Sequence, residues 1–406
     1  MHRLAIFVAF LFAGLSRTHA QWDIEASHTI ADLRGIDNVG KGIAWASGAN
    51  GTVLRTTDNG VHWQACAVPR GAENLDFRGI RAFDASIAIV MSSGKGPLSR
   101  LYKTTDACRS WTLLFTNPDS EGFWDTVSGR PDKRPYTGTI LGDPVGNVFQ
   151  LLYVRERGEG QAASISTAIL AGPRARSSPV PPPLPSESSF AASNSSLVPL
   201  RLGGVAFATG GAIPHPRVIA SACILSGDFI DCTPKVSEVP MASGPTAGIF
   251  SLATRELSTH CPSPEELAEP RSPNPLVPGP RCQTTTVIIA VGGDFGNPAG
   301  SSGTAAYTQE EENASHYEPS DQWQAAQTLP HGYRSAVAYD AATKIWITVG
   351  PNGTDISTDD GRNWRALKPS TSEPQDADQH WNALSLPFVV GPHGRIGRLD
   401  PKALAP

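Results

Sequence analysis

The sequence predicts an all-β protein, a seven-bladed β-propeller in which seven four-stranded sheets form one closed ring. Three observations lead to this fold class. A turn motif, S/T-x-D-x-G-x-x-W, occurs twice in full and once with cysteine at the glycine position. A pair of short, β-branched, glycine-bounded segments recurs in seven copies. A segment near the N-terminus also resembles the strand that the seventh copy lacks.

The seven segment pairs predict the second and third strands of seven blades. Asp58 and Asp106, at equivalent positions of two motifs, lie 48 residues apart, close to the ~40–50 residues of known propeller blades. In chain order, the pairs are 43–48 with 53–56, 87–91 with 101–104, 139–143 with 148–154, 205–209 with 218–220, 287–291 with 305–308, 346–350 with 354–357, and 388–391 with 395–398.

The seventh copy reaches Pro406 without a fourth strand. The segment from Trp22 to Ala26 begins with tryptophan, like the strands expected to start at Trp63, Trp111 and Trp364. We expect it to complete the seventh blade as its outermost strand. Closure of the ring removes the exposed strand edges that an open sheet leaves.

The motif residues are expected to build a tight turn. The aspartate accepts hydrogen bonds from backbone N–H groups of its own turn, and the glycine permits a positive φ. The tryptophan begins the next strand and buries its ring between sheets. A structural role is therefore predicted for Asp58, Gly60, Trp63, Asp106, Trp111, Asp359, Gly361 and Trp364.

Residues 1–20 have the pattern of a secretory signal. The apolar run from Leu4 to Leu15 is too short to span a bilayer, and Thr18-His19-Ala20 forms a small-residue cleavage site. We expect an exported protein, periplasmic or extracellular, with one propeller domain over residues 21–406. Proline-rich insertions near 174–189 and 262–280 are predicted to be exposed loops without packed structure.

Six cysteines in an exported chain indicate disulfides, with buried free thiols as the alternative. Two pairs are close enough in sequence to close a hairpin or the base of an insertion, and the remaining pair would join adjacent blades. The predicted bonds are Cys223–Cys232, Cys261–Cys282 and Cys66–Cys108.

Composition and motifs argue against several function classes. A net charge of −5 and a pI near 6.1 provide no basic surface for nucleic acid or anionic lipid. We found no long apolar span after the signal, no metal-binding histidine pattern, no phosphate loop and no nucleophile elbow. The prediction is a monomer with no cofactor, no metal and no membrane span.

The candidate site lies at the starts of the innermost strands, which line the central channel. There a large apolar residue alternates with a polar one, so the two face opposite ways. The loops between second and third strands lie at the same end, and the motif turns at the other. The polar set comprises Arg34, Arg78, Asp125, Ser251, Arg334 and Asn382, with Asp143 and Asp294 on the same face; the fourth blade's start is placed near Ala192.

Two interpretations of this polar set remain open. Three arginines near a channel mouth suit a carboxylate, sulfate or phosphate of a ligand. Alternatively, the arginines pair with Asp125, Asp143 and Asp294 and fill the channel, because buried polar groups usually serve one another.

The motifs resemble the Asp-box of BNR-repeat and sialidase-like propellers. Longer phrases, including Gly142-Asp143-Pro144-Val145, Phe190-Ala191-Ala192-Ser193 and Val291-Gly292-Gly293-Asp294, resemble exported propellers of the photosystem II assembly-factor-like family. This resemblance implies a seven-bladed ring, and in the assembly factors an arginine-lined face binds a partner protein. The expectation is a scaffold that binds protein or carbohydrate at this face.

A glycoside hydrolase is the alternative function. Sialidases carry an R-I-P tripeptide, whereas Arg34 and Arg78 are each followed by Gly-Ile, and no Tyr–Glu nucleophile pair is present. The alternative of a glycoside hydrolase that uses two of the carboxylates of Asp125, Asp143 and Asp294 remains open.

Overall fold

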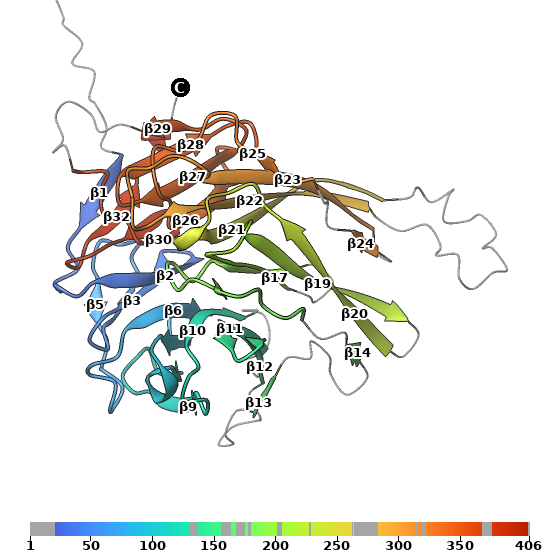
Figure 1. The fold of residues 1–406 in the computed structure, drawn as a ribbon. Coiled ribbons are helices and arrows are strands. Elements are labelled where there is room, and N and C mark those ends of the chain that lie inside the picture. Colours follow the sequence, from blue (N-terminus) through green and yellow to red (C-terminus); the bar gives the residue numbers. More distant parts are fainter. Residues whose placement is uncertain are drawn as a thin grey trace, which may run out of the picture.

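The computed structural model describes residues 21–129, 137–155, 164–167, 175–177, 180–200, 205–226, 229–261, 263, 283–313, 316–318, 322–367 and 376–404. These residues form seven mainly antiparallel sheets arranged as a β-propeller, which confirms the predicted fold class (Figure 1). The innermost strands of neighbouring blades contact one another all the way around the ring.

Blades 1, 2, 6 and 7, numbered here in chain order, are four-stranded sheets, as is blade 3. Blade 1 contains β2 (Leu33–Gly40), β3 (Ile43–Gly48), β4 (Val53–Thr56) and β5 (Gln64–Ala65), and blade 2 contains β6 (Phe77–Ala82), β7 (Ala88–Ser92), β8 (Arg100–Thr104) and β9 (Thr112–Thr116). Blade 6 contains β26 (Ala336–Asp340), β27 (Ile345–Gly350), β28 (Gly353–Ser357) and β29 (Arg365–Leu367). Blade 7 contains β30 (Ala383–Ser385), β31 (Phe388–Val390), β32 (Ile396–Leu399) and β1 (Trp22–Glu25).

Blades 3 to 5 have longer strands. Blade 3 contains β10 (Trp124–Gly129), β11 (Thr137–Val145), β12 (Val148–Arg155) and β13 (Ser164–Thr167). Blade 4 contains β16 (Leu197–Pro199), β17 (Val205–Ala208), β19 (Arg217–Ser226) and β20 (Phe229–Glu238), with β14 (Ala175–Ser177) added in parallel. Blade 5 contains β21 (Gly244–His260), β22 (Gln283–Asp294), β23 (Ala305–Asn313), β24 (His316–Glu318) and β25 (Gln324–Ala325), and the short β15 (Glu187–Ser188) and β18 (Gly210–Gly211) extend its inner edge. Its strands and those of β19–β20 project well beyond the ring in Figure 1. Two 3-10 turns, η1 (Gly96–Leu98) and η2 (Pro401–Leu404), complete the described elements.

The N-terminal strand closes the ring as predicted. Strand β1 pairs antiparallel with β32, with Trp22 opposite Leu399 and Glu25 opposite Ile396. The buried indole of Trp22 lies 5.8 Å from that of Trp381, centroid to centroid. Both ends of the chain therefore contribute to one sheet.

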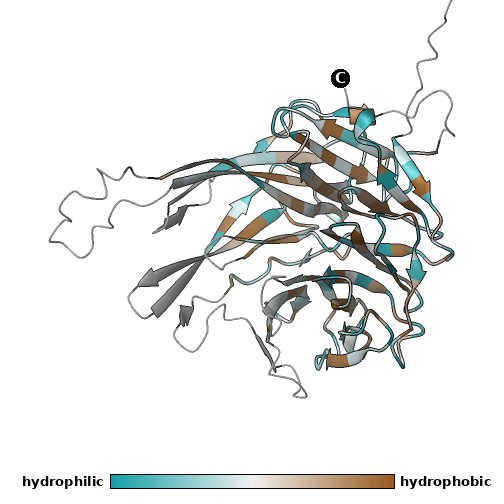
Figure 2. Ribbon diagram, turned by 180° about the vertical axis from the view of Figure 1, so that it is seen from behind, coloured by the Kyte–Doolittle hydropathy of each residue, from teal (hydrophilic) through white to brown (hydrophobic). Residues whose placement is uncertain are grey.

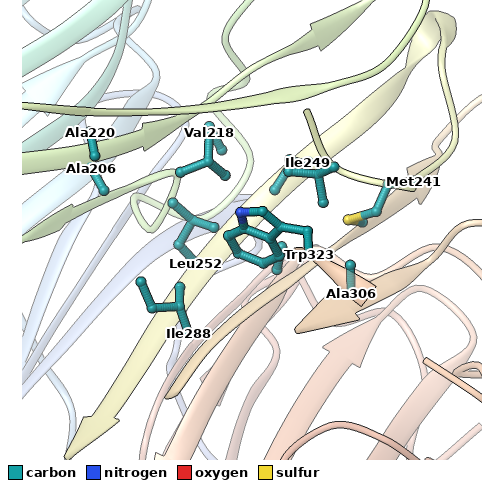
Figure 3. Packing of buried hydrophobic residues seen from close by; sticks show 12 residues of the cluster. Ala206, Val218, Ala220, Met241, Ile249, Leu252, Ile288, Ala306 and Trp323 are labelled. Atoms are coloured by element: carbon teal, nitrogen blue, oxygen red, sulfur yellow. The ribbon is translucent and has the colours of Figure 1, made fainter. Parts of the chain in front are cut away.

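The core consists of clusters between neighbouring blades. One such cluster, shown in Figure 3, places Trp323 among Val218 of blade 4 and Leu252 and Ile288 of blade 5. Apolar and polar residues are interspersed along the strands around the ring (Figure 2). Each blade is stabilised mainly by the apolar surface that it buries against its two neighbours.

The three turn motifs share one hydrogen-bond pattern. In blade 1, Asp58 accepts from the His62 backbone N–H at 2.9 Å, and the Gly60 N–H donates to the Thr56 hydroxyl at 3.0 Å. The turns at Asp106 and Asp359 repeat both bonds. Trp63 and Trp364 are buried, whereas Trp111 is only partly buried.

The disulfide predicted between adjacent blades is present, linking Cys66 to Cys108. Cys108 stands where the other motifs have glycine and keeps a positive φ of 60°. The backbone register places Cys223 directly opposite Cys232. Cys261 is disulfide-bonded, and its predicted partner Cys282 lies outside the described residues.

The three other predicted segments have different outcomes. Residues 1–20 and most of 262–280 lie outside the described residues. No helix in the described ranges is long and apolar enough to cross a membrane. The end of the predicted loop 174–189 is packed rather than exposed, because Glu187 is 5% exposed and forms a salt bridge with Arg217.

Candidate functional site

A β-bulge at the start of the innermost strand orients the site residues. In blade 1, Leu33 lies opposite Gly48 and Gly35 lies opposite Ser47, so Arg34 is the extra residue. A bulge re-aims the side chain of such a residue. The same irregularity in blades 2, 3 and 5 makes the extra residues Arg78, Asp125 and Phe250.

Blades 6 and 7 place equivalent residues at this position. Ser335 and Asn382 each donate a backbone N–H to the second strand, to Val349 at 2.9 Å and Val390 at 2.8 Å. One cavity of about 440 Å³ is lined by the four bulge residues and by the equivalent residues of blades 6 and 7. These residues are Arg34, Arg78, Asp125, Phe250, Ser335 and Asn382.

The predicted alignment is one residue out of register in blades 5 and 6. The Arg334 N–H donates to the Gly292 carbonyl of the preceding blade, just as the Leu33 N–H donates to that of Gly391. Arg334 therefore takes the buried position of Leu33, and Ser335 takes that of Arg34. In these two blades, the residue equivalent to Leu33 is therefore Ile249 or Arg334, and not the large apolar residue that follows or precedes it, Phe250 or Tyr333.

Arg334 consequently does not line the cavity. Its side chain is 0% exposed and forms a salt bridge with Asp355 of β28. Burial raises the pKa of Asp355, but hydrogen bonding to His331 and the charge of Arg334 outweigh it and hold that pKa below its usual value. The sequence contained a signal for this pairing. Asp355 stands at a strand position where blade 1 has the apolar Leu54, so a buried cation was needed opposite it.

Ser251, in β21 of blade 5, contacts a segment that crosses the channel. Its hydroxyl is 2.7 Å from that of Ser195 and accepts the Val337 N–H of blade 6. Nearby, Asn194 accepts the Val127 N–H of blade 3 and donates to the Ile80 carbonyl of blade 2. Residues 190–196 thus bind several blades at once and form a plug across the channel.

The plug was not predicted from the sequence. The innermost strand of blade 4 begins at Leu197, several residues after the predicted start near Ala192. Phe190, Ala191 and Ala192 instead line the cavity. The bonds that hold the plug to the blades, such as that from the Ser193 hydroxyl to the Ser335 carbonyl, join residues far apart in sequence.

The two cavity arginines have different surroundings. Arg78 donates to Asp76 at 2.8 Å and to the Ala191 carbonyl at 3.4 Å. Within the described ranges, Arg34 has neither a hydrogen bond nor a salt bridge, and its buried Nε lacks a partner. Neither arginine pairs with Asp125, Asp143 or Asp294, in contrast to the channel-filling alternative.

Asp125 and Asp143 form the acidic wall of the cavity. Burial and the charge of Asp143 raise the pKa of Asp125 well above its usual value, although Arg78 opposes the change. Burial also raises the pKa of Asp143, which accepts hydrogen bonds from the Ser188 hydroxyl and the Ser189 N–H. Asp294, at the end of β22, accepts hydrogen bonds from the Thr246 hydroxyl and the Gly296 N–H and does not line the cavity.

Aromatic rings form a third wall. Phe190 stacks on Phe250 with centroids 4.1 Å apart, and Tyr333 meets Phe250 edge-on at 4.8 Å. Phe295 meets both phenylalanines edge-on and is 49% exposed. Burial raises the pKa of Tyr333 above its usual value, so its hydroxyl stays protonated.

The charged wall residues therefore separate by blade. The arginines come from blades 1 and 2 and the carboxylates from blade 3, whereas the aromatic side chains come from several blades and from the plug. In the part of the chain that the structure describes, no group of three or more His, Cys, Asp or Glu side chains could hold a metal ion.

Comparison with known proteins shows a likeness in fold. YCF48 from Cyanidioschyzon merolae aligns with a TM-score of 0.50 and 17% identity over 94% of this chain and 100% of that one. A structure titled "YCF48 bound to D1 peptide" aligns with a TM-score of 0.50 and 12% identity over 94% and 97% of the two chains. No protein-family model and no curated protein matches the sequence. At these identities the likeness shows the propeller fold alone.

Proposed function

We infer that this protein is a non-catalytic binding scaffold whose cavity holds a carboxylate group of a partner protein. The observation that carries the proposal is Arg34, a cavity-lining guanidinium without a protein partner among the described residues. An arginine is pre-organised to bind a carboxylate through paired, charge-assisted hydrogen bonds.

The aromatic wall supports a peptide as the ligand. Phe190, Phe250 and Phe295 offer apolar ring surface beside the charged groups, as in binding sites where a few polar groups fix the orientation of an apolar ligand. The likeness to a propeller titled as bound to a D1 peptide is compatible with a peptide ligand. The motif turns lie at the opposite end of the blades, so we assign them a structural role and no role in ligand binding.

We also propose that the protein acts outside the reducing cytoplasm. The Cys66–Cys108 bond and the disulfide at Cys261 are compatible with export, because disulfides persist in oxidising compartments. Non-reducing peptide mapping of protein recovered from the exported fraction should find the Cys66–Cys108 bond in most molecules; recovery from the cytoplasm with reduced thiols contradicts export.

The function is tested with defined peptides. N-acetyl-Gln-Gly-Phe with a free carboxylate, and its C-terminal amide, are titrated by calorimetry. We expect the free-acid peptide to bind wild type, and Arg34→Ala to lower the affinity for this peptide roughly tenfold to a hundredfold. The control is Arg109→Ala, an exposed arginine within the second turn motif. Equal affinity for acid and amide, or no effect of Arg34→Ala, contradicts the proposal.

A glycoside hydrolase is the second candidate, because two electrostatically coupled carboxylates share one cavity. Such an enzyme needs one carboxylic acid and one ionised partner. Aryl-glycoside substrates test it directly: turnover that Asp125→Asn or Asp143→Asn abolishes replaces the binding proposal with hydrolysis.

A further inference from the structure

The acidic wall has a buried acceptor that no protein group serves. Asp125 is 1% exposed, and its Oδ2 has no hydrogen-bond partner among the described residues. A buried carboxylate without donors is costly unless it is protonated or paired. Asp125 is also one of the residues that line the cavity.

Its neighbours do not remove this cost. Asp143 is close enough for its charge to oppose ionisation of Asp125. The charge of Arg78 favours ionisation of Asp125, but Arg78 donates a hydrogen bond to Asp76, at 2.8 Å, and none to Asp125. Ser188 and Ser189 donate to Asp143 and hold that carboxylate in place. The two carboxylates are thus fixed on one wall with acceptor capacity to spare.

We propose that Asp125 and Asp143 form a cation subsite that binds an ammonium or guanidinium group of the same ligand whose carboxylate Arg34 holds. The ligand is therefore a peptide segment that carries both charges, such as a lysine or arginine side chain near a carboxylate. This proposal rests on the proposed function and extends it by naming the second recognition element.

Two features favour an organic cation over a metal ion. Phe123 and Phe190 line the same cavity, and aromatic faces attract alkylammonium and guanidinium groups. The carboxylates come from β10 and β11 of blade 3, whereas Arg34 belongs to blade 1, two blades away. Opposite charges at separate positions suit a ligand that carries separated charges of both signs.

A second peptide isolates this subsite from the carboxylate site. N-acetyl-Lys-Gly-Phe and N-acetyl-Gln-Gly-Phe, both with free carboxylates, differ only in the cation. We expect wild type to bind the lysine peptide about tenfold more tightly, as one charged hydrogen bond provides. Asp125→Asn should remove this preference while the glutamine peptide retains its affinity.

The control is Asp294→Asn, which removes a nearby carboxylate that does not line the cavity. Binding of the lysine peptide should also release protons, because a bound cation favours ionisation of Asp125; calorimetry in two buffers measures this release. Asp143→Asn provides an independent variant, and thermal melts verify that each variant is folded.

The outcomes distinguish the two proposals. If neither peptide binds, or if Arg34→Ala has no effect, the proposed function fails. If both peptides bind wild type equally, or if the lysine preference survives in both Asp125→Asn and Asp143→Asn, only the cation subsite is overturned. Displacement of the lysine peptide by millimolar Ca²⁺, but not by methylammonium, also overturns it in favour of a metal site.

Discussion

Blades 1 and 6 both begin with an arginine directly after a large apolar residue, but the two arginines occupy different places. Arg34 lines the cavity without a protein partner, whereas Arg334 is fully buried against Asp355. The difference is one residue of register relative to the preceding blade. One position decides whether an arginine is available to a ligand or is part of the core.

The blades also fill the buried position differently. In blade 1, Leu33 and Leu54 belong to one apolar cluster. In blade 6, Arg334 and Asp355 take the two equivalent places as an ion pair. Buried ion pairs stabilise little relative to apolar replacements, but removal of one partner leaves an uncompensated charge.

The largest predicted effect tests this contrast. Arg334→Ala should lower the free energy of unfolding by about 3–5 kcal/mol, because Asp355 is left buried without its cation. Arg34→Ala, the matched control, should change it by no more than about 0.5 kcal/mol. Denaturant unfolding measures both; comparable losses contradict the distinction between the two arginines.

The double variant Arg334→Leu with Asp355→Leu converts blade 6 to the blade 1 arrangement. It should be much more stable than Arg334→Ala and lie within about 2 kcal/mol of wild type, since an apolar pair can replace a buried ion pair. A double variant as unstable as the single one indicates that the His331–Asp355 hydrogen bond, at 2.8 Å, contributes more than the ion pair.

The Arg334 region also predicts a pH dependence. Burial raises the pKa of Asp378 to about 6, although bonds from Thr354 and Trp22 and the charge of Arg334 oppose the change. The folded protein therefore binds this proton more tightly than the unfolded chain does. The resulting stability is fully present below about pH 4 and is lost as the pH rises through 6, by up to about 3 kcal/mol.

Asp378→Asn should reduce this dependence without affecting peptide binding at Arg34. Urea unfolding of wild type and variant between pH 4.5 and 7.5 provides the comparison, and the difference between the two curves isolates Asp378 from the other buried carboxylates. Parallel curves for the two proteins contradict the assigned pKa shift.

In blade 5, as in blade 6, one residue of register separates a cavity residue, Phe250, from a buried structural residue, Ser251. Ser251→Ala should cost about 1–3 kcal/mol, because the buried Val337 N–H loses its acceptor, and should leave peptide affinity unchanged. Phe250→Ala should weaken peptide binding because Phe250 lines the cavity. Titration and thermal unfolding of the two variants provide the test; a binding defect in a fully folded Ser251→Ala contradicts the assignment.

The smallest effect separates the two ends of blade 1. Asp58→Ala removes turn hydrogen bonds and should cost about 0.5–1.5 kcal/mol. The affinity of N-acetyl-Gln-Gly-Phe should equal that of wild type, because the turn lies at the end of the blade opposite Arg34. Calorimetric titration beside a thermal melt measures both quantities.

The sequence by itself determined the repeat architecture. Strand alternation, glycine boundaries and the turn motif are local patterns, and they predicted seven blades, closure by the N-terminal strand and the Cys66–Cys108 bond. They also identified Arg34, Arg78, Asp125, Asp143 and Asn382 as residues of one face, which the structure places around one cavity.

Tertiary structure decided which of these groups are available. The register in blades 5 and 6 depends on hydrogen bonds to the preceding blade, such as that from Arg334 to Gly292, which no local pattern specifies. The plug is held by contacts between residues far apart in sequence. Whether a charged side chain is paired depends on which blade faces it, and only the closed ring determines that.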